Sequence, residues 1–249
     1  MLTLFIFILG LIIGSFLNVC IYRLPQGKSI VTPPSHCFAC GTRLKPGDLI
    51  PVISYIVQRG RCRYCGTVFS FRYVVVELIT AVLFVWCFQV TGLGPELLKA
   101  LIFISFLIVI TFIDYDYQLI LDKVLIWFTG AGVAINLYIG CPAITDMLIA
   151  AVTGGGLLLL IAVITRGGMG GGDIKFVAAL GLWLGLKLTI LTLFLSFVIG
   201  GIGSLLLLIF KLKGRKDFIP FGPFIAVGAF VSSLYGIEII GWYLKTFAR

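Results

Sequence analysis

The chain has 249 residues, of which 60% are hydrophobic and only 12% are charged, and its formal net charge is +9. Ordinary soluble domains are roughly 45–50% apolar, so this composition excludes one and indicates a polytopic membrane protein. The positive charge does not require a nucleic-acid partner, and we expect none, because the basic residues follow the predicted membrane topology.

Eight apolar segments alternate with more polar stretches. A helix that crosses the hydrocarbon layer needs about 20 residues, with a range of roughly 17–25. Seven of the segments fit or nearly fit this length, and the sixth segment is short. The segments lie near residues 1–22, 73–90, 98–113, 124–140, 147–165, 174–186, 188–210 and 223–244. The sequence therefore predicts an all-α polytopic membrane protein with about eight transmembrane helices.

The distribution of basic residues indicates whether the short segment 174–186 crosses the bilayer. If all eight segments cross and 23–72 is cytoplasmic, fifteen of the nineteen basic residues lie on the cytoplasmic side, as the positive-inside rule requires. If 174–186 only dipped into the bilayer, the basic residues of 211–216 would lie on the opposite side. We therefore predict eight crossings with both termini outside. The chain then divides into a first transmembrane helix at 1–22, a cytoplasmic loop domain at 23–72 and a membrane-embedded domain at 73–249.

The loop domain contains two Cys-x-x-Cys pairs separated by twenty-one residues, Cys37 with Cys40 and Cys62 with Cys65. Two such pairs can complete a tetrahedral zinc site, and two disulfides are the alternative. The predicted cytoplasmic location favours zinc, because disulfides rarely persist there. All four ligands would be protein thiolates, so we expect structural zinc that supplies most of the folding energy of the loop.

The same loop is electropositive. Residues 23–72 contain eight basic residues and a single acid, Asp48. A location on the surface of an anionic lipid bilayer explains this charge without any other ligand.

Two polar residues lie inside predicted helices of the amino-terminal third. Asn18 is embedded in the first apolar segment, and Glu77 lies about one turn inside the second. Asn18 is either an inter-helix hydrogen-bond donor or a site residue. Glu77 is either a functional acid or an acid that snorkels to the interface or pairs with a nearby Arg or Lys.

Acidic residues concentrate in two places further along the chain. Asp114, Asp116 and Asp122 fall within nine residues at the end of the third apolar segment. Asp114 is closest to the hydrocarbon layer, and Asp122 is placed to cap the following helix. Asp173 follows a loop in which five of the six residues from Gly167 to Gly172 are glycine.

Asp173 is open to two interpretations. It is either the N-cap of the next helix or a catalytic or ion-binding acid at the membrane surface. The predicted crossings bring Asp114 and Asp173 to the same side of the bilayer. Two carboxylates that meet there would share a proton, and such a pair can activate a water and polarise a peptide carbonyl, as in aspartic proteases. Glycines before Asp173 would let an extended substrate backbone come close.

Several motifs occur in a fixed order between about residues 10 and 228. They are Gly14-Ser15-Phe16-Leu17-Asn18-Val19 with Tyr22-Arg23-Leu24-Pro25, the two cysteine pairs, Ile113-Asp114-Tyr115-Asp116, Gly170-Gly171-Gly172-Asp173-Ile174-Lys175, and Ile219-Pro220-Phe221-Gly222-Pro223-Phe224. This combination closely resembles that of the type IV prepilin peptidases.

The resemblance implies an intramembrane aspartic protease of the Gly-x-Gly-Asp type in the bacterial cytoplasmic (inner) membrane. Such an enzyme removes the short basic leader from prepilins or pseudopilins at the cytoplasmic face, in the service of type IV pili, protein secretion or competence. By position, Asp114 and Asp173 match the catalytic aspartates and the four loop cysteines match the metal ligands. The substrate loop would comprise Gly170, Gly171, Gly172 and Lys175.

Many members of this family also methylate the new amino terminus with S-adenosylmethionine as the methyl donor. The cysteine-bearing amino-terminal portion that the resemblance associates with methylation is present here. The chain has no glycine fingerprint of a soluble nucleotide-binding domain. The candidate residues for the methyl-donor site are Asn18, Arg23 and Glu77.

Two other classes of function are compatible with parts of the sequence. A proton- or cation-coupled transporter could use the same buried acids, although it leaves the cysteine pairs unexplained. A scaffolding subunit of a pilus or secretion machine would not need Asp114 or Asp173 at all.

Overall fold

The structure is a computed structural model, and it describes residues 1–211, 214 and 219–247. Packing divides the chain into two compact units, Met1–Leu97 and Leu98–Arg249. The predicted cytoplasmic location of 211–216 rests largely on Lys213, Arg215 and Lys216, which lie outside the described residues. Arg249, one of the basic residues predicted to lie outside, is also not among the described residues. The predicted domain boundaries at 22/23 and 72/73 stay a prediction.

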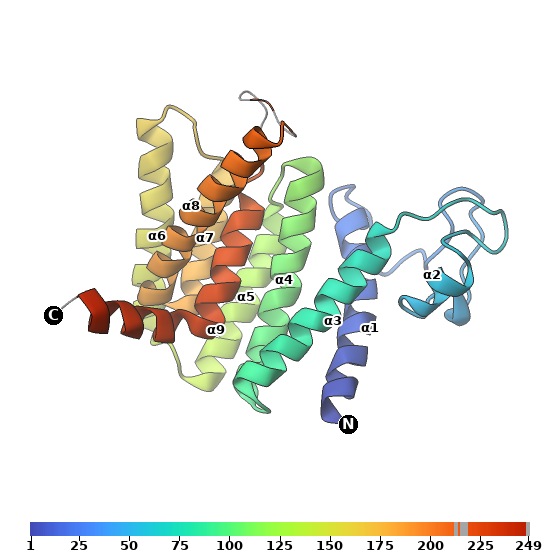
Figure 1. The fold of residues 1–249 in the computed structure, drawn as a ribbon, viewed down its shortest axis with the longest axis horizontal. Helices are drawn as coiled ribbons and strands as arrows, with labels where there is room; N and C mark the ends of the chain where they lie inside the picture. The colour runs from blue at the N-terminus through green and yellow to red at the C-terminus, as the bar shows by residue number, and fades with distance from the viewer. Residues whose placement is uncertain (212–213, 215–218, 248–249) are drawn as a thin grey trace. The chain divides into compact units, whose positions relative to one another are not determined.

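The first unit is a pair of long helices with a loop domain between them in sequence. Helices α1 (Leu2–Arg23) and α3 (Arg72–Thr91) lie side by side (Figure 1). Gly10 and Gly14 allow this close packing, because a Cβ atom on them would lie 2.5 Å from Ala81 Cα and 2.7 Å from Glu77 Cα. Small residues four apart are a common helix interface in membranes, where backbone contact replaces the hydrophobic effect. The intervening loop contains the 3₁₀ helix η1 (Pro46–Asp48) and the short helix α2 (Ile53–Val57).

The second unit is a bundle of helices in its described part. It contains most of α4 (Pro95–Tyr117), then α5 (Asp122–Ile139), α6 (Ile144–Ile164), α7 (Gly171–Leu184), α8 (Leu186–Ile209) and α9 (Gly222–Phe247). Helix α7 packs against α5, α6, α8 and α9 and is the core of the bundle. Its Phe176, Leu180 and Trp183 side chains are completely buried. The Trp183 ring stacks on Phe128 of α5, and its indole N–H donates to the Phe128 carbonyl at 2.8 Å.

The short helix α7 ends inside the bundle, where water cannot satisfy its last carbonyl groups. Its 14 residues span about 21 Å at 1.5 Å per residue. The Asn136 amide of α5 donates to the carbonyls of Leu182 and Trp183 at 2.8 and 3.1 Å. The backbone N–H of Leu186, which starts α8, donates to the Asp146 carboxylate at 3.3 Å. Neighbouring side chains therefore satisfy the backbone at the break, as a membrane interior requires.

Each of the eight predicted apolar segments forms a helix in the structure. Among the described residues, six helices are long and apolar enough to cross a membrane, namely α1, α3, α4, α6, α8 and α9. The other two long helices, α5 and α7, have 18 and 14 residues. The all-helical, multi-pass membrane fold is therefore confirmed. That α5 and α7 also cross the bilayer stays a prediction. The predicted orientation, with both termini outside, stays a prediction too.

Candidate active site

Asp114 lies in the last turn of α4, and its side chain is buried with 5% of its surface exposed. Its Oδ2 atom accepts a hydrogen bond from the backbone N–H of Gly222 at 3.0 Å. Gly222 is the first residue of α9. A helix amino terminus carries unpaired N–H groups and a partial positive charge, so it stabilises a carboxylate placed against it.

Asp173 lies in the first turn of α7 and is 8% exposed. The N-cap of α7 is Gly170, so the interpretation of Asp173 as the N-cap residue is wrong by three positions. Its carboxylate instead accepts a hydrogen bond from the Gly170 backbone N–H. This arrangement is one half of a capping box, in which an acid at the third helical position reaches back to the N-cap.

The two acids come together in the second unit. The charge of Asp114 acts electrostatically on Asp173, although the two are far apart in sequence. Each carboxylate is held by the amino terminus of a different helix, Asp114 by α9 and Asp173 by α7. Two buried carboxyl groups in this relation do not ionise together easily. Such a pair has the components of a general base and a general acid.

The predicted substrate loop packs closely against its neighbours at two points. A Cβ atom on Gly172 would lie 2.9 Å from Ile120 Cβ, whereas one on Gly171 would meet open space. The Nζ atom of Lys175 lies 2.8 and 3.0 Å from the two carboxylate oxygens of Asp122. Both side chains of this ion pair are largely exposed, 59% for Lys175 and 65% for Asp122. The pair joins the second turn of α7 to the first residue of α5.

Asp122 itself was expected to cap α5, and that expectation is wrong by one residue. The N-cap is Leu121, and Asp122 is the first helical residue. An acid at that position still suits the positive end of the helix. Its contact with Lys175 was not predicted, because residues 53 apart in sequence give no local signal of contact.

The four loop cysteines form one cluster in the first unit. The Sγ atoms of Cys37, Cys40, Cys62 and Cys65 all lie within 4.8 Å of one another. The Cys37 and Cys65 sulfurs are 3.7 Å apart, close to the roughly 3.8 Å that a tetrahedral zinc ion with bonds of about 2.3 Å requires. The cluster therefore fits a single metal ion. All four cysteines are free thiols, so the alternative of two disulfides is not what the structure contains.

The two cysteine pairs are built alike. Each pair is followed by Gly-Thr. The backbone N–H of the first cysteine donates to the threonine carbonyl in both pairs, Cys37 to Thr42 at 3.0 Å and Cys62 to Thr67 at 2.8 Å. The Thr42 and Thr67 hydroxyls lie 3.3 and 3.2 Å from the second cysteine sulfur of each pair. The Thr67 hydroxyl lowers the pKa of Cys65 to about 6. A lowered pKa favours the thiolate that a metal ion binds.

Asp48 is the centre of a polar network that sequence reasoning did not identify. Its carboxylate accepts hydrogen bonds from the Lys45 N–H, the Gln58 amide and the Tyr64 hydroxyl, each at 3.1 Å. Arg63 Nε lies 3.2 Å from the same carboxylate. Tyr64 and Arg63 lie between the two cysteines of the second pair, so Asp48 connects η1 to the cysteine cluster. The signal was present in the sequence, since Asp48 is the one acid of this loop.

The three candidates for the methyl-donor site lie in the first unit and are buried. The Asn18 amide donates to the Tyr73 carbonyl at 3.0 Å, and Arg23 donates to the Ser29 carbonyl at 3.1 Å. Glu77 accepts the backbone N–H of Val52 at 2.8 Å. Each therefore has a structural role within its own unit. Their role toward a cofactor stays a prediction.

A multi-pass membrane protein with two buried acids at helix amino termini has the components of a membrane aspartic peptidase, and its four-cysteine loop could hold a metal ion. Two family models match the chain. Residues 8–91 match the bacterial peptidase A24 N-terminal domain, and residues 101–205 match the type IV leader peptidase family.

Characterised relatives cover nearly the whole chain. A prepilin leader peptidase/N-methyltransferase of Bacillus subtilis is 39% identical over 241 residues, covering 96% of this chain and 97% of the relative. Proteins of the same name from Aeromonas salmonicida and Xanthomonas campestris are each 33% identical, over 97% and 95% of this chain and 93% and 92% of their own lengths. No solved structure matched the chain. The chain therefore belongs to the type IV leader peptidase family. Neither the family models nor these relatives support the transporter alternative.

Proposed function

We propose that this protein is a prepilin leader peptidase that also methylates the amino terminus it creates. The observation that carries the proposal is that the charge of Asp114 acts on Asp173 within one unit, with each acid bound to a helix amino terminus. The names of relatives that are 33–39% identical over almost the full length support the same activity. The substrates would be prepilins or pseudopilins.

In the proposed peptidase reaction, the ionised acid of the pair removes a proton from a water molecule, which attacks the carbonyl carbon of the scissile peptide bond. The protonated acid donates a hydrogen bond to the carbonyl oxygen and stabilises the developing negative charge. Collapse of the tetrahedral intermediate breaks the C–N bond, and the leaving amine takes up the proton removed from water. The N–H groups of Gly222 and Gly170 hold the two carboxyl groups in place throughout.

Substrate access is proposed along the glycine loop. Gly171 faces open space, so the backbone there is not shielded by a side chain. An extended peptide could therefore approach Asp173 from this side. Lys175 is exposed at the same end of α7 but is already paired with Asp122.

The proposed location is the bacterial inner membrane, with the acid pair and the loop domain facing the cytoplasm. This orientation agrees with the concentration of basic residues on one side of the predicted topology. It also places the pair where the basic leader of a prepilin is retained during membrane insertion.

Zinc and S-adenosylmethionine are the proposed cofactors. Cys37, Cys40, Cys62 and Cys65 would hold zinc, which has a structural role because its four ligand positions are filled by thiolates. S-adenosylmethionine supplies an electrophilic methyl group when bound. Asn18, Arg23 and Glu77 are proposed for that site, and each now makes a hydrogen bond to the chain's own backbone.

The test is incubation of the purified protein with a prepilin and S-adenosylmethionine, followed by mass measurement of the product amino terminus. Both activities together predict loss of the leader and a gain of one methyl group. Loss of the leader without methylation would confine the activity to the peptidase. An unchanged prepilin under conditions in which the Bacillus subtilis relative is active would contradict the proposal.

A further inference from the structure

The short helix α2 of the first unit exposes an apolar face. Ile53, Ile56 and Val57 are 58%, 67% and 69% exposed, and none of the five residues of α2 is buried. Ile50 just before the helix is 46% exposed. An apolar cluster on an outer surface marks a contact with another apolar phase rather than with water.

A partly buried hydrogen bond ties the start of α2 to one of the membrane helices. The Val52 N–H, at the N-cap of α2, donates to Glu77 Oε2 at 2.8 Å. Glu77 is the sixth residue of α3, so it lies about 7.5 Å past the start of that helix at 1.5 Å per residue. The start of α2 therefore lies within the reach of one glutamate side chain from the second turn of α3. Figure 1 shows α2 to the side of the α1–α3 pair.

The backbone is strained at the point where α2 is attached. Val52 has φ 60° and ψ −51°, and the Ile53 N–H donates to the Pro51 carbonyl at 2.6 Å. This is a γ-turn that a β-branched residue rarely adopts. Glu77 holds the turn from the membrane side, and its carboxylate also binds Ser15 of α1. Strain of this kind persists only where surrounding contacts fix the conformation, so the placement of α2 is specified by the membrane helices themselves.

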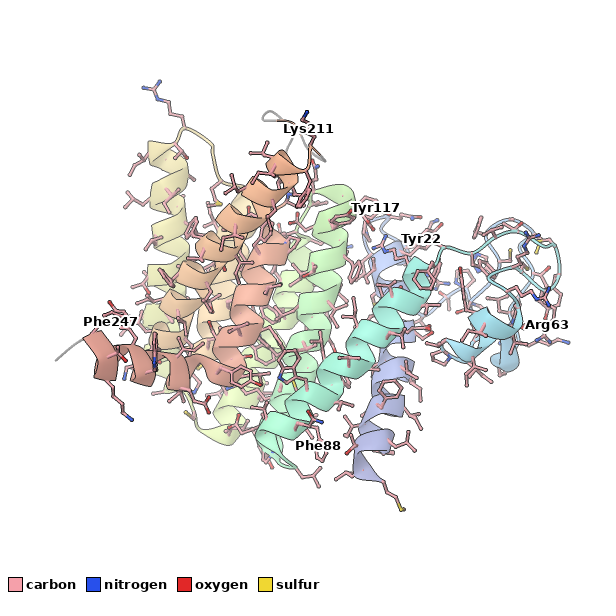
Figure 2. All side chains as sticks on the ribbon, in the orientation of Figure 1. Tyr22, Arg63, Phe88, Tyr117, Lys211 and Phe247 are labelled. Carbon is pink, nitrogen blue, oxygen red and sulfur yellow. The ribbon has the colours of Figure 1, made fainter. Side chains whose placement is uncertain are left out.

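Basic residues follow the apolar face along the chain. Arg59 lies two residues past the end of α2, and Arg61 and Arg63 come shortly after it, all with exposed side chains. Figure 2 shows Arg63 on the same outer part of the loop domain as α2. Arg63 is partly neutralised by Asp48, whereas the loop as a whole has one acid against eight basic residues. An apolar face with basic flanks is the pattern of an interfacial helix that binds an anionic bilayer.

We propose that α2 inserts its apolar face into the interfacial layer of an anionic lipid leaflet and so anchors the cysteine cluster to the membrane surface. Ile53, Ile56 and Val57 contact the upper acyl chains, and Arg59 and Arg61 contact lipid phosphates. The lipid surface is continuous with the one that covers α1 and α3, because the Val52–Glu77 bond places α2 alongside α3. The inference rests on the membrane location of these helices and is independent of the chemistry of Asp114 and Asp173.

The experiment uses the full chain in nanodiscs with brominated phosphatidylglycerol and measures tryptophan fluorescence. The variant Ile56→Trp is compared with Gln26→Trp, an exposed position three residues past the end of α1. The four native tryptophans are common to both variants and to the unaltered chain. Their fluorescence is therefore subtracted by using the signal of the unaltered chain. Ile53→Trp is the second test position if Ile56→Trp loses metal or does not fold.

An interfacial α2 predicts at least about twofold stronger lipid quenching at position 56 than at position 26. It also predicts weaker quenching when brominated phosphatidylcholine replaces phosphatidylglycerol, because the arginines lose their anionic partners. Equal quenching at both positions would overturn the proposal. So would protection of position 56 from both brominated lipid and aqueous iodide, because the face would then be covered by protein, either another part of this chain, a second copy or a substrate. Prepilin cleavage is measured separately, so failure of this proposal is distinct from failure of the peptidase assignment.

Discussion

Gly222 donates its backbone N–H to Asp114 across 3.0 Å, and its position leaves no space for a side chain. A Cβ atom there would lie 2.5 Å from Asp114 Oδ2 and 3.1 Å from Cγ of the same residue. The two residues are 108 positions apart, at the end of α4 and the start of α9. This contact explains why the Pro-Phe-Gly-Pro motif accompanies the acid pair, since a glycine is needed for the helix end to reach the carboxylate.

We predict that Gly222→Ala lowers the rate of prepilin cleavage by roughly 100-fold with little change in substrate affinity, because a displacement of about 1 Å at a reacting group has an effect of that size. Gly241→Ala in the same helix is the matched control, since a Cβ atom there meets open space. Single-turnover cleavage assays with both variants provide the measurement. Near-normal cleavage by Gly222→Ala would show that this contact does not position Asp114.

The Lys175–Asp122 pair allows a test of whether Lys175 acts on the substrate or on the fold. Exposed ion pairs contribute about 0–1 kcal/mol to stability. Asp122→Asn should therefore lower the free energy of unfolding of the second unit by about 1 kcal/mol at most. The double variant Asp122→Lys with Lys175→Asp should restore the coupling, measured by a double-mutant cycle on thermal unfolding. If it also restores cleavage, Lys175 has a positioning role. If stability returns without cleavage, Lys175 contacts the substrate.

Zinc removal should unfold the loop domain selectively. Structural zinc supplies about 10–16 kcal/mol of binding free energy in small domains, and residues 24–71 contain few other buried side chains. We predict close to one zinc per chain, lost in Cys62→Ser and retained in Cys141→Ser, whose exposed thiol lies outside the cluster. Metal analysis and limited proteolysis of the loop give the two readouts. A metal-free native chain with intact thiols and a protected loop would contradict the prediction.

The contacts of Asp48 predict how the stability of the loop domain depends on pH. Burial opposes its ionisation, but the Lys45 N–H, the Tyr64 hydroxyl and Arg63 outweigh burial and hold the pKa of Asp48 below its ordinary value of 3.8. A folded-state pKa below the unfolded value means that the stabilisation is complete above about pH 4 and is lost only as pH falls through the lower value.

The variant Asp48→Asn tests this. We predict about tenfold faster hydrogen exchange in the loop, the size expected for a lost charged hydrogen bond. The difference from the unaltered chain should stay constant between pH 8 and pH 5, a range in which the carboxylate remains ionised. A difference that already shrinks between pH 7 and pH 5 would mean that the pKa of Asp48 is raised rather than lowered.

Hydropathy and cysteine spacing predicted much of the fold. Apolar segments of membrane length gave the helices because lipid requires every backbone group to bond within its own segment. The cysteine cluster followed from two identical local spacings, although the Gly-Thr after each pair was not used. Glu77 and Asn18 were correctly identified as polar residues within helices, but their partners were not, because Val52 and Tyr73 lie 25 and 55 residues away.

The acid pair shows what the sequence could not provide. Counting crossings predicted that Asp114 and Asp173 reach the same side of the membrane, but topology alone does not bring two side chains together. Asp114 is held by Gly222 at the start of α9, and Asp173 is held by Gly170 at the N-cap of α7. The N-cap error at Asp173 has the same origin, since local sequence does not fix which residue of a glycine run starts the helix.

The most direct test of the central claim is cleavage of a co-expressed prepilin by Asp114→Asn and Asp173→Asn, read as the mass of the mature product, with Asp116→Asn as the neighbouring control. Asparagine keeps the size of the side chain but cannot hold or transfer the shared proton. We predict that either of the first two variants abolishes cleavage at normal expression and zinc content, while the control cleaves. Normal cleavage by both Asp114→Asn and Asp173→Asn would contradict the two-acid mechanism.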